Sequence, residues 1–154
     1  MRVSDVLADS LACNCSVLRK AARRVSLLYD RHLARSGLTI GQYAILAEIA
    51  RLPEDDPPSL TTLAHGLAMD RTALSHTLKP LERDGLVRVG RDQRDRRAKL
   101  VHLTALGRKR AAVARACWAE AQARFLGAFG DDQAIALRAL LRMVADADFG
   151  EPAP

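Results

Sequence analysis

The sequence is poor in aromatic residues and in cysteine, and it has no long apolar run. Aromatic residues make up 4% of its 154 residues, so the core must be built mainly from Leu, Val, Ile and Ala. Its three cysteines, Cys13, Cys15 and Cys117, are too few for a disulfide framework. No apolar run approaches the roughly 20 residues that a membrane span needs, and the acid-bearing start of the chain lacks a signal-peptide core. We therefore expect a cytoplasmic protein with no membrane partner.

The composition is that of a folded domain. Hydrophobic residues make up 49% of the chain and charged residues 27%, which excludes a disordered protein. A chain of 154 residues can bury enough surface to fold without a disulfide or a metal. We therefore expect one domain over residues 1–154, with no cofactor.

The positive charge is concentrated in one segment. The formal net charge is +6, from 24 Lys and Arg against 18 Asp and Glu. Residues 88–110 contain only two acids, Asp92 and Asp95, but nine basic residues: Arg88, Arg91, Arg94, Arg96, Arg97, Lys99, Arg108, Lys109 and Arg110. Such a local excess is typical of a surface that binds nucleic acid.

Two helices are expected before this basic segment. Apolar positions in residues 18–33 recur at helical spacing, and the Gly of Ser36-Gly37 suits a helix end. Thr39 and Gln42 have the spacing of a capping box, which predicts the start of a second helix that stops before Pro53.

Residues 59–85 predict a helix-turn-helix. Ser59 can cap a short helix, and after a brief turn Asp70 can cap another. Pro80 is expected to kink this second helix, and Gly85 to end it. One face of the helix carries leucines, and the other carries side chains that can bind bases or phosphates in a DNA major groove: Arg71, Thr72, Ser75, His76 and Lys79. A solvated face of an ordinary helix is the alternative interpretation.

Two aliphatic segments, residues 86–90 and 100–103, flank a strongly charged connection. We expect a β-hairpin whose tip carries Arg91, Arg94, Asp95, Arg96, Arg97 and Lys99. These basic side chains would repel one another without an anion nearby, and narrow minor grooves attract inserted arginines. The hairpin therefore favours DNA binding over a merely solvated face. A long helix capped by Thr104 and a last helix capped by Asp131 or Asp132 are expected to follow.

This region resembles the winged-helix signature of the MarR family. The resemblance rests on two stretches within residues 60–107, L-T-T-L-A-H-G-L-A-M-D-R-T-A-L-S-H-T-L-K-P-L-E-R-D-G-L-V and D-Q-R-D-R-R-A-K-L-V-H-L-T-A-L-G. It implies a mainly α fold with a small β-hairpin wing. A winged helix-turn-helix part at about residues 38–104 would be flanked by dimerisation helices at about residues 5–36 and 104–147. Arg97 would enter the minor groove and Asp95 would orient it, whereas His76 stands where family members often have Arg.

In function, the resemblance implies a homodimeric, sequence-specific regulator of transcription that binds double-stranded DNA. We expect a repressor on a pseudo-palindromic operator, released by a small aromatic or acidic ligand. The dimer contacts would come from apolar residues of the terminal helices: Leu7, Leu11, Phe125, Phe129, Leu137, Leu140, Leu141 and Val144. The ligand pocket would lie between these helices and the winged part, with candidate residues Arg24, Tyr29, His32, Tyr43 and Trp118. Each of the five is equally an ordinary amphipathic residue.

Thiol oxidation is the alternative trigger. In the hydroperoxide-sensing branch of the family one cysteine early in the first helix reacts, and Cys15 stands at a similar distance before L-T-I-G-Q-Y. Arg19 and Ile40 occupy the places of that branch's tyrosines, although Arg19 would still favour a thiolate. Cys13 and Cys15, two residues apart on a helix, point to nearly opposite sides, so we do not expect a disulfide between them. The apolar neighbours of Cys15 predict partial burial, so we favour a ligand.

Other function classes find less support. The sequence has no phosphate-binding loop, nucleophile elbow or metal-hydrolase motif, so we expect no enzyme. The cysteines and the four histidines, His32, His65, His76 and His102, lack metal-ligand spacing. The alternative of another class is an architectural nucleic-acid-binding protein that uses the basic wing without reading sequence.

Overall fold

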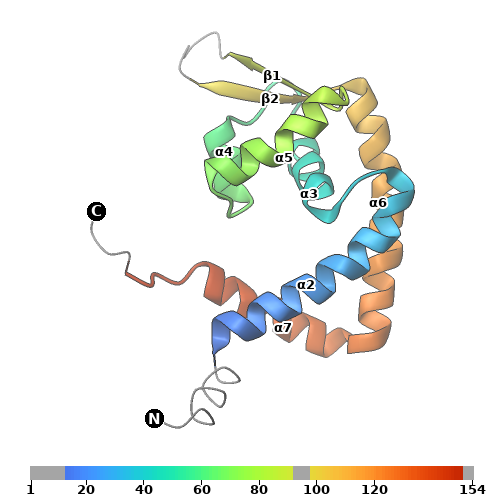
Figure 1. Cartoon of the computed structure of the whole chain (residues 1–154), viewed down its shortest axis with the longest axis vertical. Coiled ribbons are helices and arrows are strands. Elements are labelled where there is room, and N and C mark those ends of the chain that lie inside the picture. The colour runs from blue at the N-terminus through green and yellow to red at the C-terminus, as the bar shows by residue number, and fades with distance from the viewer. Residues whose placement is uncertain (1–12, 92–97, 151–154) are drawn as a thin grey trace, which may run out of the picture.

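The computed structural model describes residues 13–91 and 98–150 of the chain. Within them the fold is mainly helical with one β-hairpin, as predicted (Figure 1). The elements, in chain order, are α2 (Asn14–Leu33), the short 3-10 helix η1 (Ala34–Ser36), α3 (Ile40–Ala50), α4 (Leu60–Gly66), α5 (Arg71–Arg83), β1 (Val87–Arg91), β2 (Lys99–Leu103), α6 (Ala105–Phe129) and α7 (Asp131–Ala145). No helix within these residues is long and apolar enough to cross a membrane.

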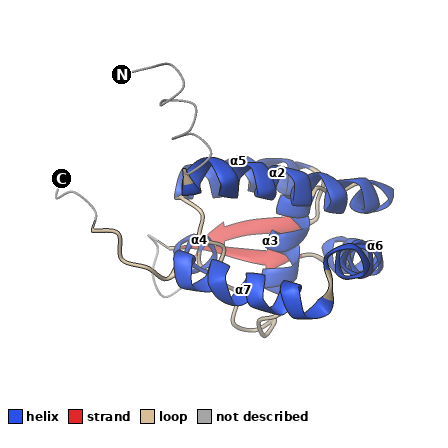
Figure 2. Ribbon diagram, turned by 90° about the horizontal axis from the view of Figure 1, so that it is seen from below, coloured by secondary structure: helices blue, strands red, loops and turns tan. Residues whose placement is uncertain are grey.

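The molecule has two ends joined by α6. Helices α3, α4 and α5 gather with the β-hairpin at one end, and α6 runs from there to the other end, where α2 and α7 lie (Figure 1). Figure 2, in which α6 is seen end-on, shows α2 and α7 as separate layers. The DNA-binding candidates and the terminal helices are therefore held apart by one long, continuous helix.

Local capping chemistry sets most helix starts where the sequence predicts them. Thr39 and Gln42 form the complete capping box of α3. The side chains of Ser59, Asp70 and Thr104 accept backbone N–H bonds at the starts of α4, α5 and α6, at 3.0, 2.7 and 2.9 Å. These caps fix the rotational phase of each helix, and thereby decide which side chains face the core.

One predicted cap differs in the structure. The N-cap of α7 is Gly130, with φ of +91°, and the expected caps Asp131 and Asp132 lie instead in the first helical turn. There their charges still favour the helix N-terminus, because the helix dipole is positive at that end. Pro80 lies inside α5, and the helix ends at Arg83, just before Gly85, as predicted.

One hydrophobic core holds the winged end together. Its fully buried large side chains are aliphatic, as the shortage of aromatic residues predicts: Leu33, Ile45, Leu46, Leu63, Leu74, Leu81 and Val101. Along α6 the buried face is made of small residues: Gly107, Ala111, Ala114, Cys117 and Ala121. Small side chains let neighbouring helices approach closely, so α6 packs tightly against α2 and α3.

The hairpin is attached firmly at its root. Strands β1 and β2 pair antiparallel from Val87 with Leu103 to Arg91 with Lys99. The last of these pairs places Arg91 and Lys99 at the strand ends, whereas the sequence suggested that they belong to the connection. The Leu86 carbonyl accepts the Thr104 N–H at 3.1 Å, so the strand root is tied to the start of α6.

Candidate nucleic-acid interface

Helix α5 has two faces of opposite character. Leu74, Leu78 and Leu81 are buried in the core, with 1%, 4% and 1% of their surface exposed. The five predicted groove-facing residues are all exposed on the other side: Arg71, Thr72, Ser75, His76 and Lys79. The leucine face therefore holds the helix in place while the polar face lies open to a partner.

The exposed face of α5 is rich in hydrogen-bond donors. The Asp70 carboxylate, which accepts the Ala73 N–H, acts as a cap. The Ser75 hydroxyl donates to the Arg71 carbonyl at 2.7 Å, which orients the hydroxyl and leaves its lone pairs free to accept. Within the described part of the chain, no acidic side chain forms an ion pair with Arg71 or Lys79. Their charges can therefore bind phosphate or base acceptors.

The wing is described only at its base. Arg91 and Lys99 are exposed at the paired ends of β1 and β2. The other predicted wing residues, Arg94, Asp95, Arg96 and Arg97, lie outside the described residues. Their contact with a minor groove therefore remains an expectation.

The hairpin and α6 carry three further basic groups that were not among the predicted contact residues. Arg88 and His102 are cross-strand partners, and Arg108 follows in the first turn of α6. Burial, and then the charge of Arg88, lower the pKa of His102. The sequence predicted both strands of the hairpin. It did not predict their register, which decides that Arg88 pairs with His102.

The five candidate pocket residues are spread over several places. The rings of Tyr43 and Trp118 are neighbours, with centroids 6.4 Å apart. The Tyr29 hydroxyl, by contrast, donates to Gln122, and Arg24 is exposed on α2. Only Tyr43 and Trp118 thus come together as an aromatic pair.

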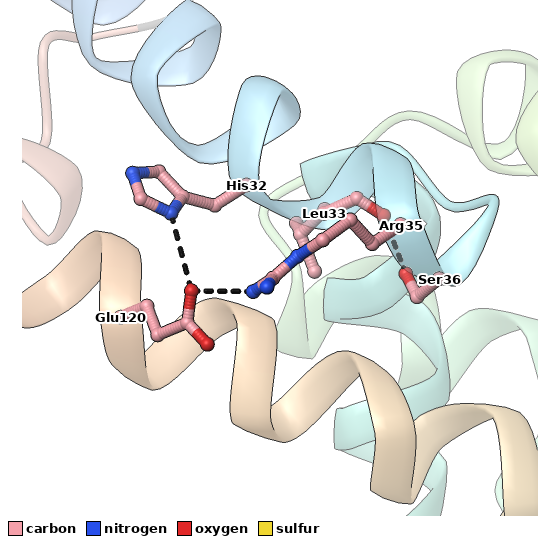
Figure 3. A network of polar contacts seen from close by, with 5 residues as sticks. All are labelled: His32, Leu33, Arg35, Ser36 and Glu120. Carbon is pink, nitrogen blue, oxygen red and sulfur yellow. Dashed lines mark hydrogen bonds and ion pairs between the residues drawn. The ribbon is translucent and has the colours of Figure 1, made fainter.

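His32 belongs to a polar network that fastens η1 to α6 (Figure 3). The Glu120 carboxylate bonds to Arg35 and lies 3.7 Å from His32 Nδ1. The bond to Arg35 holds the pKa of Glu120 below its ordinary value. Nearby, Arg110 Nη1 donates to the buried Ser36 carbonyl at 2.9 Å. The network fastens the end of α2 and η1 to α6.

Two cavities adjoin the candidate pocket residues. The Tyr43 cavity, of about 530 Å³, lies between α3 and the start of α6, and its charged lining residues are Arg51, Arg108 and Arg115. Tyr29 lines a second, mostly apolar groove of about 500 Å³ between α2, α6 and α7. Arg108 and Arg115 stand seven residues apart on α6, a spacing that places them on one face and that could have signalled the basic site.

Apolar side chains remain exposed along the terminal helices. Of the predicted dimer contacts, Phe129, Leu140, Leu141 and Val144 are 40–60% exposed. Phe125 and Leu137 are half-buried, and they line the groove of Tyr29. Leu7 and Leu11 lie outside the described residues.

The thiols differ in accessibility. Cys13 and Cys15 are exposed at the start of α2, and Cys117 is buried on α6. The partial burial expected for Cys15 is therefore wrong for the single chain, because α2 turns this position toward solvent. Hydrogen bonds from Ser16 lower the pKa of Cys13.

Comparisons with known sequences place the chain in a family. The model of the MarR family matches residues 36–98. The transcriptional regulator HosA of Escherichia coli O111:H- is 30% identical over 131 residues, which cover 81% of this chain and 95% of HosA. The transcriptional activatory protein BadR of Rhodopseudomonas palustris is 38% identical over 78 residues, 51% of this chain, and the match spans only 45% of BadR.

Solved structures agree with this assignment. The M. tuberculosis transcriptional regulator MosR in complex with DNA is 34% identical, with a TM-score of 0.72 over 88% of this chain and 99% of MosR. Bordetella bronchiseptica BpsR, whose DNA binding is regulated by 6-hydroxynicotinic acid, is 25% identical, with a TM-score of 0.78 over 88% and 95%. The Streptomyces coelicolor regulator PcaV, in complex with its natural ligand, is 25% identical, with a TM-score of 0.79 over 90% and 95%. This chain thus belongs to the MarR family and is a winged helix-turn-helix transcriptional regulator, not an enzyme.

Proposed function

We propose that this protein is a homodimeric repressor that binds a pseudo-palindromic operator and leaves it when a small aromatic acid binds. The observation that carries the DNA-binding part is the outer face of α5, where five polar or basic side chains are exposed opposite a buried leucine face. A helix of this kind fits the major groove, with the residues of its first turns nearest the base edges. Arg71 and Ser75 would read bases, and Lys79 would bind phosphate.

The wing supplies the second contact in this proposal. The exposed Arg91 and Lys99 lie at its base and support a phosphate contact there. Arg97, at the predicted tip, would enter the minor groove, where negative potential attracts arginine. The groove helix would then supply sequence discrimination and the wing mostly affinity.

The terminal helices would form the dimer. Val17, Leu140 and Met143 are 55%, 60% and 69% exposed, an unusual number of large apolar side chains for the ends of a monomer. A second copy packed on α2 and α7 would bury them. Two reading helices related by a two-fold axis need half-sites about 10 base pairs apart, so the operator would be pseudo-palindromic.

The Tyr43 cavity is the effector site in this proposal. An aromatic ring can stack on Tyr43, whose ring centroid lies 6.4 Å from that of Trp118, and Arg115 can bind its carboxylate. The regulation of the relative BpsR by 6-hydroxynicotinic acid supports an aromatic acid as the ligand class. The cavity lies between the winged end and α6, so an occupant can favour one spacing of the reading helices over another.

Variants separate the parts of the DNA contact. We expect Arg71→Ala and Ser75→Ala to lower discrimination between the operator and altered duplexes by about 1–3 kcal/mol. Arg97→Ala should weaken binding to all duplexes and reduce the salt slope by about one. Arg124→Gln, on an exposed part of α6 far along the chain from α5, is the matched control and should change neither quantity. Unaltered discrimination in both α5 variants would contradict the proposal.

The effector site has its own reporter. Trp118 is the only tryptophan, and its ring neighbours Tyr43, so its fluorescence should respond to a ligand that contacts Tyr43 in this cavity. Adding 6-hydroxynicotinate or benzoate should change this fluorescence and release operator DNA over the same concentration range. Arg115→Gln should weaken both effects together, whereas Arg124→Gln should weaken neither. Release of DNA without a fluorescence change would place the effector elsewhere.

Oxidation of a thiol is a second candidate for the trigger. It is supported by the exposure of Cys13 and Cys15 and by the lowered pKa of Cys13. Treating the parent, Cys13→Ser, Cys15→Ser and the double variant with an organic hydroperoxide distinguishes the two triggers. If the parent releases DNA and Cys15→Ser does not, oxidation is the signal. If all four proteins stay bound, the ligand remains the trigger.

A further inference from the structure

A separate cavity lies beneath the hairpin, away from the outer face of α5. It has a volume of about 420 Å³, within the usual range for small-molecule sites. The end of α3, the loop after it, both strands and the start of α6 contribute its walls. Ile49, Leu52 and Pro57 supply apolar wall, so the interior can hold a hydrocarbon body.

The rim of this cavity is positively charged. Arg88 and His102 face each other across the strands, and both of their side chains lie over Gly90, which leaves room for them. Arg108 comes from the first turn of α6. Among the described residues that line the cavity, Glu54 is the only acid. Two guanidinium groups and one imidazole thus face one carboxylate.

Glu54 indicates which ligand the rim suits. Its Oε1 lies 3.1 Å from Arg108 Nη1, and the same guanidinium nitrogen donates to the Leu103 carbonyl at 3.1 Å. A carboxylate can therefore bind Arg108 without disturbing the hairpin. The Glu54 side chain is 75% exposed on a loop, and exposed ion pairs of this kind are weak. An incoming carboxylate can exchange with it at little cost.

We propose that this cavity binds a small monocarboxylate with an apolar body, which replaces Glu54 on Arg108 and lies between Arg88 and the apolar wall. The site differs from the Tyr43 cavity, with which it shares Arg108 but neither Arg88 nor His102. Both strands form its walls, so an occupant favours particular positions of the wing and thereby changes DNA affinity. The inference needs no operator and stands apart from the effector site proposed above.

Benzoate titration of the free full-length protein tests the site, followed through the His102 ring protons by NMR. The measurement is made at about pH 8, where an imidazole with a lowered pKa is neutral. His102→Gln assigns the signal. We expect a saturable shift with benzoate and binding of acetate, which lacks the apolar body, at least about tenfold weaker.

Charge variants decide the mode of binding. Arg88→Gln should weaken benzoate binding about tenfold, because it removes a charged hydrogen-bond donor. Glu54→Gln should tighten it several-fold, a gain that a misfolded variant cannot give. Lys109→Gln removes a charge from the same turn of α6 outside the cavity and should leave binding unchanged.

Three results would overturn this site. The first is a His102 shift that does not saturate with benzoate. The second is an equal loss of benzoate affinity in Lys109→Gln and Arg88→Gln. The third is loss of the His102 shift in Arg115→Gln, which alters only the Tyr43 cavity. Failure of the effector proposal would instead appear in Trp118 fluorescence, so the two failures are distinguishable.

Discussion

Replacing Gly107 with alanine should destabilise the protein, although alanine is the better helix former. Gly107 is buried in the first turn of α6. A Cβ atom there would lie 2.0 Å from the Leu86 carbonyl oxygen and 2.8 Å from Leu103 Cδ1. Carbon–oxygen contacts are normally about 3.3 Å or longer, so α6 or the hairpin root must move by more than about 1 Å.

The structure gives little room for that movement. The Leu86 carbonyl accepts both the N–H and the hydroxyl of Thr104, each at 3.1 Å. Overpacking costs about 1–3 kcal/mol, and a weakened hydrogen bond about 1 kcal/mol. The helical preference of alanine over glycine returns about 1 kcal/mol. We therefore expect Gly107→Ala to lower the free energy of unfolding by about 1–3 kcal/mol.

Urea unfolding at one fixed protein concentration measures this effect, because dimerisation makes stability concentration-dependent. Gly127 lies in the same helix, and a Cβ atom there meets nothing within 4 Å. Gly127→Ala is thus the matched control and should raise stability by up to about 1 kcal/mol. If Gly107→Ala is as stable as the parent, the close contact between α6 and the hairpin root does not exist.

Four further predictions follow from single residues. Thr39→Ala should lower the free energy of unfolding by about 1 kcal/mol through loss of the capping box of α3, and an unchanged urea midpoint would contradict this. Leu33→Ala should lower it by about 2–5 kcal/mol, since Leu33 is 0% exposed; a loss below 1 kcal/mol would mean that the core is looser than described. Cys117, buried on α6, should react with a thiol reagent only when the protein is unfolded by urea, and rapid reaction in the native protein would disprove its burial. The pKa of His102 is lowered on folding by burial and by Arg88, so the unfolded chain takes up this proton first and stability falls as the pH drops below about 6.5; His102→Gln should flatten that fall, and an identical pH profile would refute the assignment.

The sequence was most informative where structure depends on nearby residues. Thr39, Ser59, Asp70 and Thr104 begin their helices as predicted, because a cap bonds only to a residue two or three positions ahead. Once Asp70 fixes the start of α5, the leucine spacing decides which side of that helix faces out. The start of α7 was missed because it depends on the positive φ of Gly130, which no neighbouring residue type announces.

Sites built from distant segments were harder to predict. Helical spacing indicates which face of α2 or α6 a residue occupies, but not which other element meets that face. Of the residues predicted to share one ligand pocket, Tyr43 and Trp118 are neighbours, whereas Arg24 lies exposed elsewhere. The pairing of Arg88 with His102 depends on hairpin register, and the approach of Glu54 to Arg108 depends on the packing of a loop against α6. None of these contacts leaves a local pattern in the sequence.

Binding to a cognate operator and to a scrambled duplex of equal length tests the central claim most directly. The operator can be obtained by sequencing the DNA that the protein binds in cells, and affinity and stoichiometry measured at about 0.15 M salt, near physiological ionic strength. The account predicts two chains per operator and binding at least about 10³-fold tighter than to the scrambled duplex. Equal affinities for the two duplexes would show an architectural protein that does not read sequence, and one chain per site would contradict the dimer.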